Sequence, residues 1–252
     1  MLGASALMAL VWLVQRHTGD AGLVDVAWAG SVGALALAYC WHGAGLPERR
    51  LLAGLLGGLW SCRLALYLFC DRIRAAAEDG RYQMLRHNWG DRAPLYFFLF
   101  FQVQALLVVA FALPFLLVAH NPSPLSIWDG LGAAIFAVAL LGESLADRQL
   151  ARFRRDPHNR GHTCASGLWR YSRHPNYFFE WLHWWAYVPM AAYSVWGLAS
   201  LAAPAAMLYL LFFVTGIPYT EKQALRSRGE DYRAYQRRTS AFVPWFPRKE
   251  RP

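Results

Sequence analysis

The chain alternates long apolar segments with short segments that carry most of its charge. Crossing a bilayer takes about 20 residues of helix, and seven apolar segments reach or approach that length. They cover residues 2–16, 21–42, 51–70, 93–119, 125–146, 176–193 and 195–217. The first and sixth are short, and several contain a proline, which membrane helices tolerate. The pattern predicts an all-α, polytopic membrane protein with about seven transmembrane helices.

Composition supports this prediction. Of 252 residues, 56% are hydrophobic and 16% are charged, which favours an integral membrane protein over a soluble domain. No repeat or low-complexity linker divides the chain, so we expect one integral membrane domain over residues 1–252. The first apolar segment lacks a basic start and an Ala-x-Ala cleavage site, so we interpret it as a retained span. The four cysteines form no CxxC pair and indicate no disulfide framework.

Positive charge is distributed unequally between the loops. Of the 25 Lys and Arg residues, all but three fall in the first, third and fifth loops and in the C-terminal tail. Arg49 and Arg50 lie in an alternate loop, and Arg63 lies within a span. Because cytoplasmic loops carry the excess of Lys and Arg, the N-terminus is predicted outside and the C-terminus in the cytoplasm. These arginines follow the topology rule, so we predict no nucleic-acid partner.

The last charged segment, residues 219–240, has an apolar face. A cytoplasmic amphipathic helix on the membrane surface or over a pocket fits this pattern. Its apolar positions recur at near-helical spacing: Leu225, Tyr232, Tyr235 and Phe242.

The segment from Gly167 to Trp181 is the most informative part of the sequence. An arginine-rich loop leads into Pro175, and proline is favoured at the first position of a helix. The free amides and positive dipole of a helix start can hold a phosphate. Glu180 and His183 follow on one face of that helix. Polar groups in such an apolar stretch are costly and are functional by default, although His183 also fits a hydrogen-bonded core histidine.

Further polar residues lie near the predicted cytoplasmic side. Glu143 and Asp147 are one turn apart and fit either a polar cavity or ion pairs with nearby arginines. In Asp79-Gly80-Arg81-Tyr82, Gly80 allows a tight turn. Asp25 and Arg63 fit either a structural pair or a cavity.

Several chemistries lack their motifs. No Walker loop, GxGxxG, GxSxG or HExxH occurs, so a nucleotide would have to bind without a Rossmann fold. The spacing of His158, His162 and Cys164 could suit zinc, but no fourth ligand lies near, and we predict no metal site.

Four stretches resemble one family. Leu168 to Tyr177 with Glu180-Trp181 is similar to bacterial membrane proteins related to steroid 5α-reductase, and three other stretches resemble the same group: Val24 to Trp28, Glu78 to Tyr82, and Glu221 to Trp245. The resemblance implies an all-helical reductase of the bacterial inner membrane. Such enzymes bind NADPH on the cytoplasmic side and reduce a C=C bond of a steroid-like or other lipid enone. The arginines favour NADPH over NADH, because arginine accommodates a 2′-phosphate.

The resemblance also implies roles for individual residues, most of them in the C-terminal half (140–247). The implied cofactor-binding residues are Arg63, Arg81, Asp147, Arg154, Arg170, Arg173, His174, Asn176, Tyr177, Glu180, Glu221, Tyr232 and Tyr235. For the proton donor that such a reaction needs, the sequence offers three candidates, Asp25, Tyr67 and Tyr82, and does not choose between them. The sequence departs from the family at Trp60, where animal enzymes carry a substrate-binding tyrosine, and this leaves a steroid and another lipid enone both open.

Two other functions remain open. Membrane methyltransferases that use S-adenosylmethionine share the Arg-His-Pro-x-Tyr stretch and a later glutamate, here Glu221. A non-catalytic membrane scaffold that kept the fold is the third interpretation, which Trp60 allows.

Overall fold

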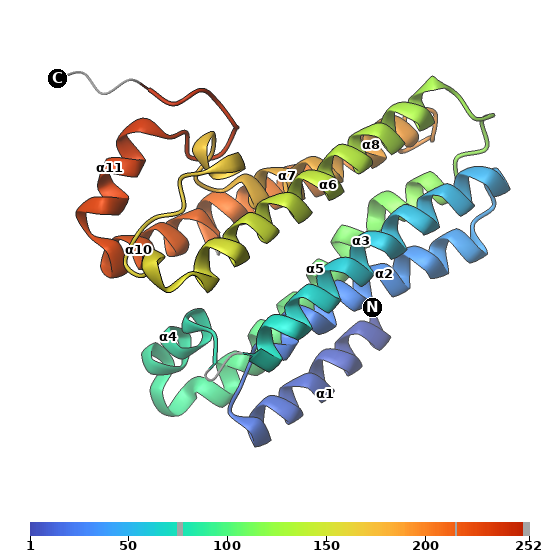
Figure 1. Ribbon diagram of the computed structural model, residues 1–252. Helices are drawn as coiled ribbons and strands as arrows, with labels where there is room; N and C mark the ends of the chain where they lie inside the picture. The colour runs from blue at the N-terminus through green and yellow to red at the C-terminus, as the bar shows by residue number, and fades with distance from the viewer. Residues whose placement is uncertain (75–77, 215, 249–252) are drawn as a thin grey trace. The chain divides into compact units, whose positions relative to one another are not determined.

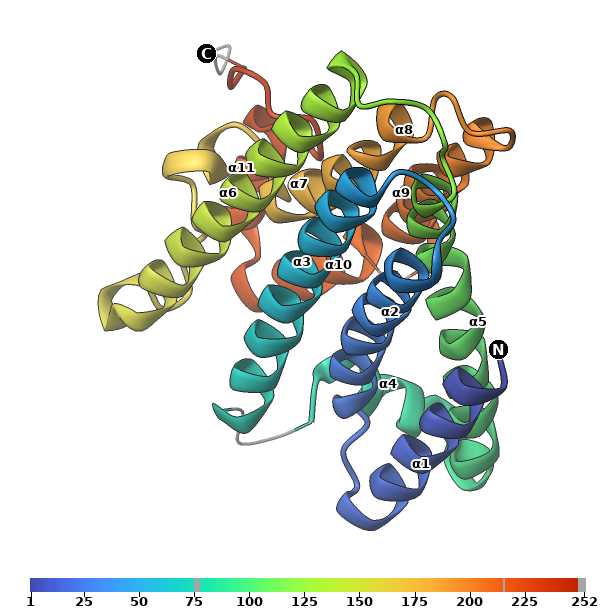
Figure 2. The same ribbon diagram turned by 90° about the vertical axis from the view of Figure 1, so that its right-hand side faces the viewer.

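The computed structural model describes residues 1–74, 78–214 and 216–248, without the side chains of residues 72–74. Arg72, Arg74, Lys249 and Arg251, which enter the charge count above, therefore lie outside the described side chains. The described part of the chain is helical and contains no strand, so the predicted all-α class is confirmed. Contacts divide the chain into two compact units, and each is described by itself (Figures 1 and 2).

Unit 1 comprises residues 1–126 and 191–200. Its elements are α1 (Leu2–Thr18), α2 (Leu23–His42), α3 (Pro47–Arg74), α4 (Gly80–Trp89), η1 (Gly90–Arg92), α5 (Ala93–Ala119) and the start of η4 (Gly197–Leu201). Helix α2 packs against α3 and α5, and α1 packs against α5 (Figure 2).

Small residues bring these helices close together. A Cβ at Gly33 would lie 2.1 Å from the Ser61 hydroxyl, and a Cβ at Gly57 would lie 2.5 Å from the Phe115 ring. The Ser61 hydroxyl then donates to the Ala29 carbonyl at 2.8 Å. Close approach at small residues is the usual way that membrane helices associate, so glycine at these two positions is a packing requirement.

Unit 2 comprises residues 127–190 and 201–252. Its elements are α6 (Ile127–Arg155), η2 (Pro157–Asn159), η3 (Gly167–Arg170), α7 (Pro175–Trp185), α8 (Tyr187–Met190), α9 (Ala202–Tyr209), the π-helix η5 (Leu210–Val214), α10 (Ile217–Arg228) and α11 (Glu230–Arg238). Helices α7 and α8 lie along α6 (Figure 1), where Gly142 faces the Phe179 ring and Gly132 faces Met190.

In the part of the chain that the structure describes, five helical segments are long and apolar enough to cross a membrane: Leu23–His42, Pro47–Asp71, Gly80–Ala119, Ile127–Arg155 and Gly197–Arg228. They correspond to five of the seven predicted spans. The first predicted span forms the 17-residue helix α1. The sixth is divided into α7, with 11 residues, and α8, with 4. An 11-residue helix is roughly 16 Å long, about half of the hydrocarbon thickness.

The C-terminal segment also differs from its prediction. Two helices, α10 and α11, replace the single amphipathic helix, because Gly229 between them adopts a φ of +53°. That backbone conformation suits glycine and ends α10. The predicted apolar face is confirmed, since Tyr232, Tyr235 and Phe242 are buried and Leu225 packs against the two tyrosines.

Candidate functional site

Helix α7 begins at Pro175, as the sequence predicts. Two amides of its first turn find partners within the chain. The Tyr177 N–H donates to the Asn176 side-chain oxygen at 3.1 Å, and the Phe178 N–H donates to the His174 carbonyl at 3.1 Å. The helix start therefore offers a ligand fewer free amides than a glycine-rich phosphate loop does, and side chains carry more of any recognition here.

Four polar side chains form a network around the loop that precedes α7. We call it the Arg173–Glu221 network, and its members are Arg173, His174, Glu221 and Gln236. The Arg173 Nε donates to Glu221 Oε1 at 2.7 Å, and its Nη1 donates to the carbonyls of Gln236 (3.1 Å) and Thr239 (2.8 Å). The Gln236 amide donates to Glu221 Oε2 at 2.8 Å, and His174 Nε2 lies 3.3 Å from Glu221 Oε1. The network thereby joins the loop before α7 to α10 and α11.

The network is largely shielded from solvent. The side chains of Arg173 and Glu221 are 12% and 17% exposed, and that of His174 is 3% exposed. The His174 ring stacks on the Tyr177 ring at 5.3 Å, and the Tyr177 hydroxyl lies 3.1 Å from the Thr220 hydroxyl. A shielded ion pair adds little net stability, so the main effect of these contacts is to hold the side chains in one arrangement.

Two tyrosines of α11 lie beneath the same loop. Burial raises the pKa of both Tyr232 and Tyr235 above the usual range for tyrosine, so both phenols stay protonated at physiological pH. The Tyr235 hydroxyl donates to the Trp169 carbonyl and, at 3.1 Å, to the Ser172 carbonyl. Tyr235 therefore positions the loop that carries Arg173.

Helices α6 and α7 contribute a second polar group. The Asn176 amide donates to the buried Asp147 carboxylate at 3.3 Å. One turn further along α7, the Glu180 carboxylate accepts from the Trp184 indole at 3.2 Å. His183 is buried and lies 2.8 Å from the Tyr187 hydroxyl, which confirms a hydrogen-bonded core histidine.

Arginine lines two hollows in unit 2. One, of about 290 Å³, is lined by Arg173, Arg237, Arg238 and Arg248 together with Trp245 and Phe246. Another, of about 190 Å³, is lined by Arg154, Arg160 and Arg228. The remaining predicted arginine, Arg170, is exposed and lies 6.0 Å over the Tyr171 ring. Guanidinium groups in such number suit a ligand with several phosphate charges.

Unit 1 brings three predicted residues, Asp25, Arg81 and Tyr82, together with Asp79 in a separate group that we call the Asp25 cluster. The Tyr82 hydroxyl donates to Asp25 Oδ1 at 2.6 Å, and Arg81 Nη2 donates to Asp25 Oδ2 at 2.9 Å. Asp79 caps α4 by accepting from the Arg81 N–H at 2.8 Å. Gly80 therefore begins a capped helix rather than forming an isolated turn, and its φ is not positive.

The other two predicted site residues of unit 1, Arg63 and Tyr67, lie on α3. Arg63 places its guanidinium 5.6 Å over the Tyr67 ring, which is 40% exposed. Trp60, at the position where the sequence departs from the family, is fully buried and packs edge-on against Trp28 at 6.1 Å. Its indole therefore serves the packing of α2 against α3.

In the loop with the possible zinc ligands, the two histidines lie beside carboxylates. His158 pairs with Asp156 at 3.0 Å, and His162 lies 3.6 Å from Asp231. Burial raises the pKa of the Cys164 thiol. Among the described residues, no three or more His, Cys, Asp or Glu side chains are arranged to hold a metal ion.

Some contributing residues were not predicted. Gln236 completes the Arg173–Glu221 network, and Gln149 accepts from the Leu168 N–H at 2.9 Å. The Ser172 hydroxyl donates to the Phe242 carbonyl at 2.7 Å. None stands out from the charge or hydropathy pattern, because each acts by a contact distant in sequence.

Comparison with known proteins gives two matches. The profile of a family described as "Protein of unknown function (DUF1295)" matches residues 11–239. The "Uncharacterized protein C594.04c" of Schizosaccharomyces pombe is 28% identical over 261 residues, which cover 93% of this chain and 76% of the yeast protein. No solved structure gives a significant match.

Proposed function

From the premise that the chain belongs to the DUF1295 family, we propose that it is an NADPH-dependent membrane reductase, similar to steroid 5α-reductases, that reduces a C=C bond of a lipid enone. We place the enzyme in the bacterial inner membrane with its C-terminus in the cytoplasm. The observation that carries the proposal is the Asp25 cluster. A buried phenol held by a carboxylate and an arginine is an acid that enone reduction needs.

Tyr82 is our candidate for the proton donor. It is 2% exposed, and the Arg81 guanidinium lies 5.4 Å over its ring. Asp25 accepts the phenol hydrogen bond and thereby orients it. In the proposed reaction the phenol proton passes to the enolate, the usual task of a general acid.

The residues of unit 2 fit the proposed cofactor. Arg173, Arg237 and Arg238 around one hollow and Arg154 and Arg160 around another provide guanidinium donors for phosphates, including a 2′-phosphate. Asn176 and Glu180 supply an amide and a carboxylate of the kind that orient a ribose or a nicotinamide amide. NADPH, when bound, supplies the hydride.

Ligand-induced stabilisation tests the proposal. A ligand that binds only the folded protein stabilises it by about 2.7 kcal/mol at 100 times its Kd. We expect NADPH to raise the Tm of the purified protein, and NADH and S-adenosylmethionine to raise it less. Arg173→Ala and Glu180→Gln should abolish the NADPH-induced shift. The exposed Arg233, whose side chain is 62% exposed, gives a matched control, Arg233→Ala, which should keep it.

Other outcomes would oppose the proposal. A shift with S-adenosylmethionine alone would favour a lipid methyltransferase. No shift with either ligand would favour a scaffold.

A further inference from the structure

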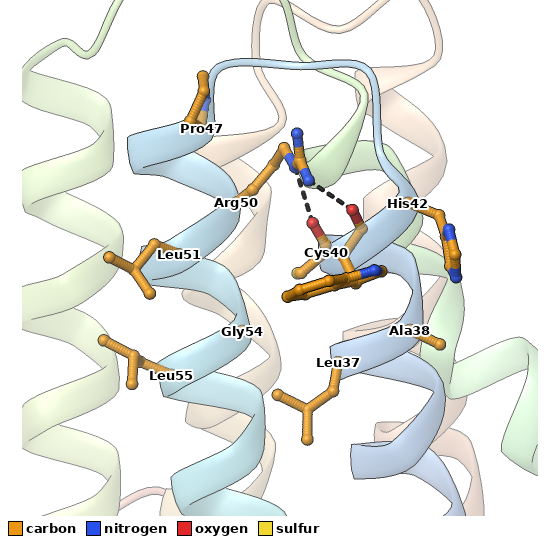
Figure 3. Close-up of a pocket in the computed structure, with 10 residues that line it drawn as sticks. Leu37, Ala38, Cys40, His42, Pro47, Arg50, Leu51, Gly54 and Leu55 are labelled. Carbon is orange, nitrogen blue, oxygen red and sulfur yellow. Dashed lines mark hydrogen bonds between the residues drawn. The ribbon is translucent and has the colours of Figure 1, made fainter.

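A cavity of about 560 Å³ lies between α2 and α3 in unit 1, where the two helices are joined (Figure 3). Leu37 and Ala38 line it from α2, and Leu51, Gly54 and Leu55 line it from α3. Its volume falls within the roughly 300–1,000 Å³ typical of small-molecule sites. These apolar residues make a groove that suits a hydrocarbon chain.

Arg50 lies at the joined end of this groove and carries a charge that no described carboxylate compensates. Its Nε donates to the Cys40 carbonyl at 2.7 Å, and its Nη2 donates to the Trp41 carbonyl (Figure 3). Carbonyls in the last turn of a helix lack helical partners, so Arg50 caps α2. A guanidinium has five N–H donors, and these bonds use two. No ion pair of Arg50 occurs within residues 1–74, 78–214 and 216–248.

The groove runs from the joined ends of α2 and α3 along both helices, each of which is long and apolar enough to cross a membrane. Helix α2 ends at His42 and α3 begins at Pro47, so Arg50 lies near the level of the lipid headgroups. Trp41 is 78% exposed, and tryptophan is enriched at that level. Leu51 and Leu55 are 65% and 55% exposed and follow further along α3.

We propose that this groove binds an anionic phospholipid, with its phosphate on Arg50 and one acyl chain along the leucines. An uncompensated cation at the mouth of an apolar groove matches the charge and the shape of such a lipid. A zwitterionic lipid fits less well, because its own cation offsets the attraction of Arg50.

Gly54 offers a direct way to fill the groove. A Cβ at this position would lie 3.4 Å from Cys40 Cβ and 3.8 Å from Leu37 Cδ2, which is ordinary van der Waals contact. The first carbon of a larger side chain can therefore be added at this position without a clash. Gly30 on α2 is exposed, and a Cβ added there would meet nothing within 4 Å, so Gly30→Leu is a matched control.

Native mass spectrometry of the purified protein with added phosphatidylglycerol or phosphatidylcholine tests the proposal. We expect the first phosphatidylglycerol to bind about tenfold more tightly than phosphatidylcholine, or about 1.4 kcal/mol. Arg50→Gln should remove this preference. Gly54→Leu should weaken the binding of both lipids, and Gly30→Leu should change neither. Should Gly54→Leu fail to fold, Leu51→Ser at an exposed position serves instead.

Equal affinity of the wild type for the two lipids would overturn the proposal, as would an unchanged preference in Arg50→Gln. Unchanged binding in Gly54→Leu would show that the lipids bind elsewhere. The result does not depend on the proposed reductase activity, since Arg50 and Gly54 belong neither to the Arg173–Glu221 network nor to the Asp25 cluster.

Discussion

Replacing Tyr235 by Phe removes one hydroxyl from beneath the loop that carries Arg173. The side chain is 2% exposed, and its hydroxyl donates to the carbonyls of Trp169 and Ser172. Loss of a hydrogen bond that leaves a buried partner unsatisfied costs about 1–3 kcal/mol. We expect Tyr235→Phe to lower the free energy of unfolding by about 2 kcal/mol, or the Tm by roughly 4–8 °C for a chain of this size.

Thermal unfolding in detergent measures this effect, and hydrogen exchange over residues 169–173 locates it. The exposed Tyr209 on α9, whose ring contacts Phe213, provides the control Tyr209→Phe. We expect the control to leave the Tm and the exchange unchanged. Equal Tm values for the two variants, or unchanged exchange in Tyr235→Phe, would refute the account of how this loop is held.

Three further outcomes are expected. Burial raises the pKa of Tyr235 in the folded protein, so its contribution to stability should be complete below about pH 10, the pKa of an unfolded tyrosine, and be lost at higher pH. Stability should therefore fall less steeply with alkaline pH in Tyr235→Phe than in the wild type, and equal pH profiles of the two proteins would contradict this. Tyr82→Phe should lower kcat with a lipid enone by roughly 10²–10⁴ and leave NADPH affinity unchanged, and an unchanged kcat would exclude Tyr82 as the proton donor. Gly167 has a φ of +60°, and a Cβ added there would lie 2.5 Å from the Gln149 amide, so Gly167→Ala should lower the free energy of unfolding by at least about 1–2 kcal/mol. The control is Gly130→Ala, because a Cβ at Gly130 meets nothing within 4 Å.

Hydropathy predicted the all-helical class and five of the seven proposed spans. It failed to show the division of residues 176–193 into α7 and α8, because a run of aromatic and apolar residues has the same hydropathy whether its helix is continuous or interrupted. The start of α7 was predictable because proline at a first helical position has a local cause. The break at Gly229 also has a local cause, since glycine adopts a positive φ readily, but the near-helical spacing of apolar residues on both sides favoured one continuous helix.

The candidate site was predictable only in part. Arg173, His174 and Glu221 were identified by resemblance, and the structure adds that they form one network around Glu221, to which Gln236 also donates. The partners of Asp25 could not be chosen from the sequence, where a structural pair with Arg63 was one of two interpretations, while the structure pairs Asp25 with Arg81 and Tyr82. Such pairings depend on contacts about 55 residues apart along the chain, which no local pattern encodes.

The most direct test of the proposed function follows the hydride itself. Purified protein in lipid nanodiscs would be given NADPH that carries deuterium at the transferable position, together with lipid enones. The account predicts loss of the NADPH absorbance band that depends on the enone, and one deuterium atom on carbon in the reduced lipid. Oxidation of NADPH without deuterium in the lipid, or no oxidation with any enone, would contradict it.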